Sequence, residues 1–452
     1  MTARILLAGT HSSVGKTTVA LALLAAWQRQ GLRPAPFKVG PDYIDPSLHA
    51  QAAGRPSRNL DSWLLDERTL RGVVRRGTRS ADVAVIEGVM GLFDGIGATQ
   101  TGSTASIARA LACPVVLVLD VAAMSGTAAA LVLGCQLTRP GVDMAGVILN
   151  RVGIDGHVRS VEEAIRAATG LPVLGSLPSD ATLSIPERHL GLVPAGEGGV
   201  TEETLDRLAD LAERRFELGT LRRIAEAAAP LADDSENELI APVAPVVRIG
   251  VAQDAAFGFY YQDTIDLLAE CGAEVVTFSP LQDASPPRAS QGVYLGGGFP
   301  ELFAEELSNN EPMRASMHDF AKRGCPVYAE CGGLMVLGQT LTTFDGEAWP
   351  MFDVLPLASR MQRQSLTIGY REVEALRSSP LMKMGTRVRG HEFHWSVAEP
   401  PTPEHAAYRV LGENRLEGFA MGAILGSYVH LNLAGAPDLA RRFVEACAAA
   451  PA

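Results

Sequence analysis

Short apolar runs alternate with longer amphipathic stretches along the first 180 or so residues. Runs such as RILLAG, DVAVIEG and PVVLVLD are each followed by a segment in which apolar residues recur with the period of a helix. The runs themselves are almost entirely apolar rather than alternating, which is typical of parallel strands covered by helices on both faces. The pattern predicts an α/β domain built on a buried parallel sheet.

The same rhythm stops near residue 200 and resumes near residue 247. A charged, helix-prone stretch at residues 201–229 is followed by PLADDSENELIAPVAPVV, where prolines and an acidic run break any period. Strand-like runs return in VVRIGVAQD, AEVVTFSP and CPVYAECGG. We therefore predict two α/β domains, residues 1–195 and 247–452, joined by a helical segment and linker at residues 196–246.

Composition narrows the classes of function. The chain has 452 residues, 47% of them apolar, which suffices for two cores. A net charge of −12 argues against a broad attraction to nucleic acid or anionic membranes. Six scattered cysteines without a C-x-x-C pair predict neither a disulfide framework nor a thiolate zinc site. Because we find no signal-peptide region and no apolar run near the ~18 residues of a membrane span, we expect a cytoplasmic protein.

The stretch AGTHSSVGKTT lies between a predicted strand and a predicted helix, which is the setting of a phosphate-binding loop. Five residues, where the usual motif has four, separate Gly9 from Gly15. Lys16 is expected to reach the terminal phosphates of ATP, and the Thr17 hydroxyl to bind Mg²⁺. A glycine turn without a ligand is the alternative. The predicted ATP-binding residues are Thr10, Ser13, Val14, Gly15, Lys16, Thr17, Thr18 and Lys38.

Acidic residues follow two neighbouring predicted strands, in FKVGPDYIDP and VIEGVMGLFDG. Strand ends of this kind form the sites of α/β proteins. Asp42 and Glu87, together with Thr17, are the predicted Mg²⁺ ligands. Asp45 and Asp94 are predicted to contact the substrate or a second metal. Simple turn residues are the alternative for Asp42, Asp45 and Asp94.

Basic residues lie beside these acids in the sequence. Lys38 is a candidate contact for the γ-phosphate or for an acyl phosphate, because a mobile point charge suits phosphoryl transfer. Arg55 and Arg58 are predicted to bind substrate carboxylates through their guanidinium groups. All three side chains could instead lie on the surface.

In the second domain, CPVYAECGGLMVLG predicts a strand, a cysteine, two glycines and a helix, which is the elbow that exposes a nucleophile. Cys331 is the predicted nucleophile, favoured as a thiolate by the helix that follows. The N–H groups of Gly297, Gly298 and Gly332 are predicted to form an oxyanion hole. A buried structural cysteine is the alternative.

Histidines complete the candidate chemistry. His430, in SYVHLN, follows an apolar run and is the predicted base for Cys331, although a structural role is the alternative. His391 and His394 in RGHEFHWS are three residues apart, whereas the helical zinc motif needs four. For these two we predict a strand position with packing or substrate contact.

These stretches together resemble the cobyrinic acid a,c-diamide synthase family, including its hydrogenobyrinic acid counterpart, in the family's order and over nearly the whole chain. The phosphate loop is similar to that of dethiobiotin synthetase, and His11 stands where partition ATPases carry a lysine. Cobyric acid synthases share the architecture but lack the GPDYIDP and SRNLDSW stretches. The stretches that carry the resemblance are GTHSSVGKTT, KVGPDYIDP, SRNLDSW, IEGVMGLFDG, PERHLGLVPAGE, LGGGFPELF, AECGGLM, GHEFHWS and SYVHLN.

The resemblance implies a dethiobiotin synthetase-like P-loop ATPase domain fused to a flavodoxin-like class I glutamine amidotransferase domain. Glutamine would be hydrolysed at Cys331 and His430, and the ammonia would attack acyl phosphates made with ATP and Mg²⁺ from the a- and c-carboxylates of a corrinoid acid, in cobalamin biosynthesis. Most class I glutaminases carry a glutamate two residues after the histidine, whereas this chain has Asn432. The resemblance therefore implies a Cys–His pair without the usual third member, and what orients His430 stays open.

Two other functions remain open at this stage. One is the amidation of a different tetrapyrrole, such as Ni-sirohydrochlorin, and the other is a non-enzymatic ATP-binding regulator with an inactive amidotransferase domain. The choice between cobalt-containing and cobalt-free rings, the order of amidation and the ammonia route are also open. The expected partners are the corrinoid acid, glutamine and ATP, with no nucleic acid and no membrane, and a homodimer is left open.

Overall fold

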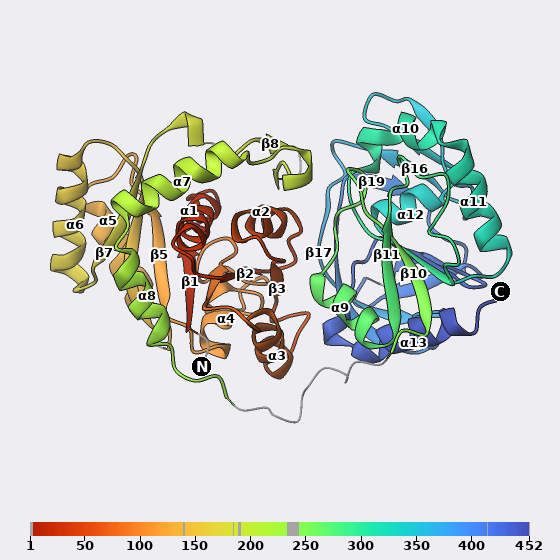
Figure 1. Cartoon of the computed structure of the whole chain (residues 1–452), viewed down its shortest axis with the longest axis horizontal. Helices are drawn as coiled ribbons and strands as arrows, with labels where there is room; N and C mark the ends of the chain where they lie inside the picture. The colour runs from red at the N-terminus through yellow and green to blue at the C-terminus, as the bar shows by residue number, and fades with distance from the viewer. Residues whose placement is uncertain are drawn as a thin grey trace. The chain divides into compact units, whose positions relative to one another are not determined.

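The computed structural model of the chain describes residues 3–138, 141–183, 185–188, 191–232, 244–413 and 415–451. The chain divides into two compact units, residues 1–237 and 238–452 (Figure 1). The last part of the predicted linker, residues 233–243, lies outside the described residues. Within the described ranges, no helix has both the length and the apolar character needed to cross a membrane.

The first unit is built on a seven-stranded parallel sheet with strand order β3-β2-β4-β1-β5-β6-β7. Strands β4 and β5 flank β1. The strands that precede β5 in the sequence lie on one side of β1 and the later strands lie on the other, and ligands bind at such a switch point in folds of this kind. The strands are β1 (Ala3–Gly9), β2 (Pro34–Val39), β3 (Arg58–Leu60), β4 (Val83–Glu87), β5 (Val115–Asp120), β6 (Met144–Val152) and β7 (Val173–Pro178).

Helices cover this sheet. They are α1 (Lys16–Arg29), α2 (Ile44–Ala53), α3 (Glu67–Gly77), α4 (Thr104–Ala110), α5 (Thr127–Thr138), α6 (Asp155–Thr169), α7 (Glu202–Arg215) and α8 (Leu218–Glu226). Short elements lie between β7 and α7: η1 (Ala181–Leu183), β8 (Glu187–Arg188), β9 (Gly191–Leu192) and η2 (Ala195–Glu197).

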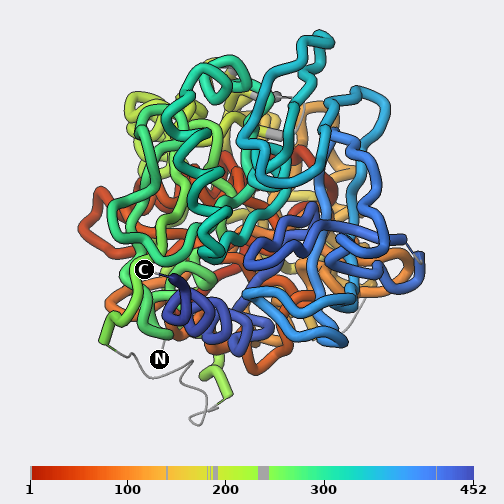
Figure 2. Tube along the Cα trace, turned by 90° about the vertical axis from the view of Figure 1, so that its right-hand side faces the viewer, coloured from red at the N-terminus to blue at the C-terminus, as the bar shows by residue number. Residues whose placement is uncertain are grey.

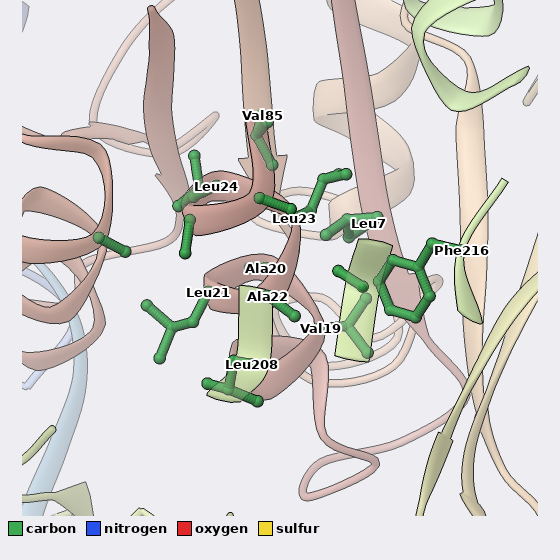
Figure 3. Packing of buried hydrophobic residues seen from close by; sticks show 14 of the residues in the cluster. Leu7, Val19, Ala20, Leu21, Ala22, Leu23, Leu24, Val85, Leu208 and Phe216 are labelled. Atoms are coloured by element: carbon green, nitrogen blue, oxygen red, sulfur yellow. The ribbon is translucent and has the colours of Figure 1, made fainter. Parts of the chain in front are cut away.

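Helix α1 is buried on nearly every side. Its sequence, KTTVALALLAAWQR, is apolar around most of its circumference, which is typical of a helix enclosed by other elements. Leu7 and Val85 of the sheet belong to the same core as its central residues, and so do Leu208 of α7 and Phe216 (Figure 3). The helical stretch predicted after residue 195 therefore packs on the first unit through α7.

The second unit is built on a nine-stranded mixed sheet of order β11-β10-β12-β13-β22-β21-β20-β17-β18. The first five strands run parallel and the last four are antiparallel neighbours. The strands are β10 (Val247–Ala252), β11 (Ala273–Phe278), β12 (Gly292–Leu295), β13 (Val327–Glu330), β17 (Thr367–Ala375), β18 (Arg387–His394), β20 (Ala406–Val410), β21 (Arg415–Met421) and β22 (Ile424–Ser427).

A smaller sheet and several helices complete this unit. The last helix, α13, packs beside α9 and β10, which come from the start of the unit (Figure 2). The helices are α9 (Gln262–Glu270), η3 (Pro300–Phe303), α10 (Ala304–Asn309), α11 (Glu311–Lys322), α12 (Gly332–Leu337), η4 (Leu433–Gly435) and α13 (Pro437–Ala448). The smaller sheet contains β14 (Thr340–Thr342), β15 (Ala348–Pro350), β16 (Ala358–Met361) and β19 (Ser396–Ala398).

Candidate active sites

The phosphate-loop sequence forms the turn from β1 into α1. Ser13 and Gly15 both have a positive φ, of 63° and 90°, so the chain curls sharply before the helix begins. A Cβ on Gly15 would lie 2.0 Å from Asn150 Nδ2, so only glycine fits there. Val14 is fully buried, and its carbonyl accepts a hydrogen bond from Asn150 Nδ2 at 2.8 Å. The Asn150 side chain of β6 therefore stabilises the conformation of the loop.

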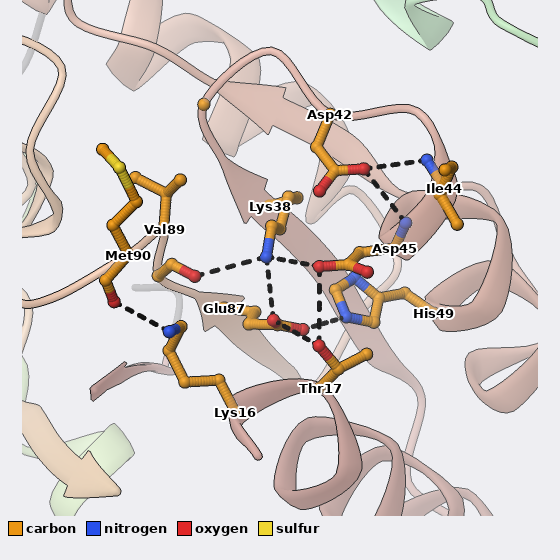
Figure 4. Close-up of polar contacts among 12 residues, drawn as sticks. Lys16, Thr17, Lys38, Asp42, Ile44, Asp45, His49, Glu87, Val89 and Met90 are labelled. Atoms are coloured by element: carbon orange, nitrogen blue, oxygen red, sulfur yellow. Dashed lines mark hydrogen bonds and ion pairs between the residues drawn. The ribbon is translucent and has the colours of Figure 1, made fainter. Parts of the chain in front are cut away.

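Lys16 folds back over this loop. Its ammonium donates to Met90 O at 2.7 Å (Figure 4) and also to His11 O at 3.2 Å. Burial and, next to it, the positive charge of Lys38 lower the pKa of Lys16 to about 8. Because both hydrogen-bond acceptors are neutral carbonyls, an anion in the loop would stabilise the charged form.

A buried charge cluster lies behind the loop. Lys38 on β2 is only 4% exposed, and its ammonium contacts Asp45 Oδ2 at 2.5 Å and Glu87 Oε1 at 2.8 Å. The Thr17 hydroxyl donates to Glu87 Oε1 at 2.9 Å and lies 3.5 Å from Asp45 Oδ2 (Figure 4). Lys38 and Glu87 are register partners on β2 and β4, so the sheet itself pairs them. Lys38 is thus not a surface lysine.

The ionisation of this cluster is governed by burial and by its own charges. Burial alone would lower the pKa of Lys38, but Asp45 and Glu87 outweigh it and hold that pKa above its ordinary value. Burial would raise the pKa of Glu87, yet Lys38 and His49 keep it well below its usual range. Burial and the negative charge of Asp42 raise the pKa of Asp45. Asp45 is therefore the group whose charge is least compensated.

The oxygen atoms of Thr17, Asp45 and Glu87 suit Mg²⁺, which prefers hard ligands and usually keeps several waters and phosphate oxygens. Their number fits a metal held jointly by protein and nucleotide rather than an all-protein site. No group of three or more Asp, Glu, His or Cys side chains arranged to hold a metal occurs in the described part of the chain.

Asp42 closes a turn, which is the alternative role that the sequence left open for it. Its Oδ1 accepts hydrogen bonds from the backbone N–H groups of Ile44 at 2.8 Å and Asp45 at 3.1 Å, which closes the turn into α2 (Figure 4). The carboxylate in contact with Thr17 is that of Asp45. The helix start explains the difference, because it turns Asp45 toward β4 and uses Asp42 to satisfy free N–H groups.

Asp94 closes a turn beside the phosphate loop. Its Oδ2 accepts a hydrogen bond from Gly91 N at 2.8 Å. A Cβ on Gly91 would lie 2.8 Å from Thr10 O, so this turn packs directly on the loop. The contact matches the turn role that the sequence left open for Asp94.

Arg55 and Arg58 contact a different part of the unit. Arg55 Nη2 donates to Gly77 O at 3.0 Å and to Arg79 O at 3.1 Å, at the C-terminal end of α3. The Arg58 side chain packs beside Gly77, where an added Cβ would lie 2.9 Å from its Cδ. The hydrogen bonds of Arg55 favour a structural role for that residue over the predicted contact with substrate carboxylates, and the substrate role of Arg58 stays a prediction.

In the second unit, Cys331 lies at a sharp bend between β13 and α12. Its φ of 49° and ψ of −103° are strained for a residue with a side chain, and its N–H donates to Ser427 O at 2.7 Å. A Cβ on Gly333 would lie 2.3 Å from Leu295 O, so the bend needs glycine after the cysteine. This is the geometry of a nucleophile elbow, although α12 spans only six residues.

The predicted oxyanion glycines converge on this elbow. A Cβ on Gly332 would lie 3.1 Å from Gly298 N, so these two backbones are in contact. A Cβ on Gly297 would lie 2.6 Å from His430 Cε1, and one on Gly298 would lie 2.0 Å from Ala256 O. The glycines thus allow the turn after β12 to approach both the elbow and the histidine.

His430 follows β22 and is buried beside the elbow. Its backbone exchanges hydrogen bonds with His391 of β18, at 2.8 and 3.1 Å. Burial would lower the pKa of His430, but the Cys331 sulfur and the Glu330 carboxylate outweigh it and raise that pKa to about 10. The protonated, imidazolium form of His430 is therefore favoured.

The two histidines of β18 are packed rather than arranged around a metal. The ring of His394 stacks on Tyr428 with centroids 4.0 Å apart, and its Nδ1 lies 2.8 Å from Ser396 O. The ring of His391 meets that of His430 at 4.9 Å and an angle of 62°. Burial lowers the pKa of both, so they are neutral near pH 7.

Comparison with known proteins places both sites in one family. Residues 5–193 match the CobQ/CobB/MinD/ParA nucleotide binding domain, and residues 248–437 match the CobB/CobQ-like glutamine amidotransferase domain. The cobyrinate a,c-diamide synthase of Synechocystis sp. is 42% identical over 98% of this chain and 93% of its own. The chain belongs to the cobyrinate a,c-diamide synthase family.

Other members are similarly related. The cobyrinate a,c-diamide synthase of Dehalococcoides mccartyi is 42% identical over 98% of this chain and 97% of its own. The hydrogenobyrinate a,c-diamide synthase of Streptomyces coelicolor gives the same three figures, 42%, 98% and 97%. Membership in the a,c-diamide synthase family confirms the predicted resemblance. The matched domains and the observed sheets confirm the predicted α/β fold.

Three polar residues of this a,c-diamide synthase chain were missed by the sequence reasoning. His49 is buried on α2 with Nε2 2.6 Å from Glu87 Oε2, and its spacing of four from Asp45 could have placed both on one helix face. Asn150 supports the phosphate loop from a strand end. Glu330 precedes Cys331 directly, as a charged residue in an otherwise apolar strand.

Proposed function

We propose that this chain is a glutamine-dependent ligase that amidates the a- and c-carboxylates of cobyrinate or hydrogenobyrinate with ATP, in cobalamin biosynthesis. The observation that carries the proposal is the strained Cys331 at φ 49°, beside His430 and a glycine turn, in a chain that also holds a phosphate loop. The ring substrate follows from the names of the relatives, two of which differ in whether the ring is cobyrinate or hydrogenobyrinate.

The two reactions are assigned to the two domains. Residues 1–195 bind ATP and the ring acid, residues 247–452 hydrolyse glutamine, and residues 196–246 contain α7 and α8 followed by the linker. The packing of α7 on α1 supports grouping the helical part of this segment with the ATP-binding domain.

Glutamine hydrolysis begins with the Cys331 thiolate, which attacks the side-chain amide carbon. The N–H groups of Gly298 and Gly332, with that of Gly297 beside them, stabilise the oxyanion that forms. His430 gives its proton to the departing ammonia, leaving a thioester on Cys331. A water that loses its proton to His430 then releases glutamate.

Amidation begins when an oxygen of the ring carboxylate attacks the γ-phosphorus of ATP and ADP leaves. Lys16 and Lys38 stabilise the charge on the transferred phosphoryl group. The loop residues Thr10, Ser13, Val14, Gly15 and Thr18 surround the phosphates. Thr17, Asp45 and Glu87 would hold Mg²⁺, which neutralises phosphate charge when bound. Ammonia attacks the carbon of the acyl phosphate, and phosphate leaves.

The experiment that tests the proposal is steady-state turnover of the purified protein with ATP, glutamine and each ring acid in turn. Diamide formation from cobyrinate or hydrogenobyrinate is expected, and the ratio of the two kcat/KM values assigns the ring. If Ni-sirohydrochlorin is amidated faster than either ring acid, it is the substrate in their place. Absence of amidation with every ring, with ATP still bound, would replace the ligase by an ATP-binding regulator.

The cytoplasm is the proposed location, and the proposed partners are small molecules, with no nucleic acid and no membrane. A homodimer remains a prediction for the assembly, which light scattering on the purified protein tests directly.

A further inference from the structure

Glu330 is the residue immediately before the nucleophile. It ends β13 and is only 1% exposed, although a carboxylate is costly to bury unless it is fully paired. Its neighbours in the strand are apolar or aromatic, so neither solubility nor ordinary packing explains an acid there.

The hydrogen bonds and the ion pair that the Glu330 carboxylate makes with described residues all come from donors. Oε1 accepts hydrogen bonds from Leu431 N at 2.8 Å and from the Tyr328 hydroxyl. Oε2 accepts one from the Tyr294 hydroxyl at 2.9 Å and lies 3.6 Å from His430 Nδ1, an ion-pair distance. Burial raises the pKa of both tyrosines well above the ordinary value, so their hydroxyls stay protonated and donate. Such a donor set stabilises an ionised carboxylate.

At the position where most class I glutaminases carry their glutamate, this chain has Asn432, which caps a turn. Asn432, two residues after His430, turns its Oδ1 to the backbone N–H of Ala434 at 3.1 Å and so caps the turn η4. An amide carries no charge that could stabilise an imidazolium. The acid that faces His430 comes instead from the end of β13, one residue before Cys331.

The geometry points to Glu330 as a positioning residue that orients His430 and stabilises its protonated form for glutamine hydrolysis. With Nδ1 turned to Glu330, the other ring nitrogen, Nε2, is left for Cys331. The contact of Leu431 N with the same carboxylate also ties the backbone after His430 to β13. This inference rests on the proposed glutaminase reaction and names the third member that the Cys–His pair lacks.

The other groups that face His430 do not replace this carboxylate. His391 and His394 are neutral near pH 7, because burial lowers the pKa of each, and Cys331 is the reaction partner itself. Glu330 is thus the negative group that remains beside His430 throughout the reaction.

The test compares Glu330→Gln with the matched control Tyr294→Phe in the full-length protein. Glu330→Gln removes the charge but keeps the shape, and we expect kcat for glutamine hydrolysis to fall about 10²-fold or more, with little change in KM, because His430 then works less well as the general acid and base. The alkaline limb of the kcat/KM profile should move to lower pH, because the imidazolium then loses its proton more readily. Tyr294→Phe removes a donor to the same oxygen but keeps the charge, and should stay within about threefold of the parent, the loss typical of one neutral hydrogen bond.

A second measurement follows alkylation of Cys331 by iodoacetamide, which reports the thiolate without requiring glutamine turnover. Glu330→Gln should slow this alkylation at neutral pH, and Glu330→Asp should restore part of it. The inference is overturned if Glu330→Gln leaves the alkaline limb and the alkylation rate unchanged, or if Tyr294→Phe lowers kcat as strongly.

Two controls separate this inference from the proposed function. Amidation with added ammonium chloride should persist in Glu330→Gln, because the first unit is unchanged, and a parent-like urea midpoint of the second unit shows that the mutated unit is folded. If Glu330→Gln does not fold, Glu330→Asp is compared with Tyr294→Phe in its place. We then expect a fall in kcat smaller than the one expected for Glu330→Gln. If the parent protein releases no glutamate from glutamine, the proposed function fails, whereas the alkylation comparison still decides the role of Glu330.

Discussion

The two sites bury their carboxylates in contrasting ways. In the first unit, Glu87 is compensated by the charged side chain of Lys38, within a cluster that contains a second carboxylate. In the second unit, Glu330 is surrounded by neutral donors, Leu431 N and two tyrosine hydroxyls, and the only charge it faces at ion-pair distance among the described residues is that of His430. The first arrangement suits a charged ligand that rebalances the cluster, and the second suits a fixed ion pair.

The largest expected effect separates the two sites completely. Cys331→Ala removes the nucleophile, and we expect glutamine-dependent amidation to fall on the order of 10⁴-fold or more. Amidation with ammonium chloride should be preserved, because the first unit keeps all of its residues. Glutamate release and diamide formation measure the two reactions.

The half-buried Cys135 of α5 offers the matched control. Cys135→Ala should leave both reactions near the parent level. Loss of ammonium-dependent amidation in a folded Cys331→Ala protein would contradict the separation of the sites.

A second variant probes the charged cluster. Lys38→Met leaves two buried carboxylates without their cation, and removing one partner of a buried pair costs about 3–5 kcal/mol of stability. The urea midpoint of the first unit should fall accordingly, while that of the second unit stays. Lys322→Met, on the exposed end of α11, is the control. An unchanged midpoint in Lys38→Met would show that the cluster is not held together by this charge.

Lys16→Ala addresses catalysis in the same unit without breaking the cluster. Its ammonium contacts carbonyl oxygens, so its loss leaves no buried charge unpaired. We expect ATP-dependent amidation to fall about 10²- to 10³-fold, the usual loss for one group that stabilises transition-state charge. Glutamate release without ATP should stay at the parent level, and an equal fall in hydrolysis would argue against independent sites.

The smallest effect is expected at Arg55. Because its guanidinium binds carbonyls at the end of α3, Arg55→Ala should cost about 1 kcal/mol of stability and leave the KM for the ring acid unchanged. A large rise in that KM, measured at saturating ATP and glutamine, would return Arg55 to the substrate site.

The sequence predicted best what is encoded locally. Apolar runs predicted the parallel sheet, and both the phosphate loop and the cysteine elbow are continuous stretches whose glycines have a fixed backbone purpose. Contacts between distant segments could not be read in this way. The bond from Asn150 to Val14 joins residues 136 apart, and the contact of Glu330 with Leu431 N spans 101.

The choice between Asp42 and Asp45 shows a second limit. Both acids belong to one short stretch, and the position at which α2 begins decides which of them turns toward Thr17. Helix boundaries are the least certain part of a pattern-based prediction. The sequence could therefore identify Asp42 and Asp45 as candidates but could not say which of them contacts Thr17. The same holds for Arg55 and Arg58, whose contacts depend on where α3 ends.

The positive φ of Cys331 has a consequence for how such chains diverge. A glycine at this position would relieve strain of about 1–3 kcal/mol and remove the nucleophile, so an inert protein without this strain lies one substitution away. Selection for activity must therefore act continuously against the relief of strain at residue 331. Copies of the gene released from that selection are expected to replace the cysteine early, and their glutaminase domains should melt at higher temperature than those of active relatives.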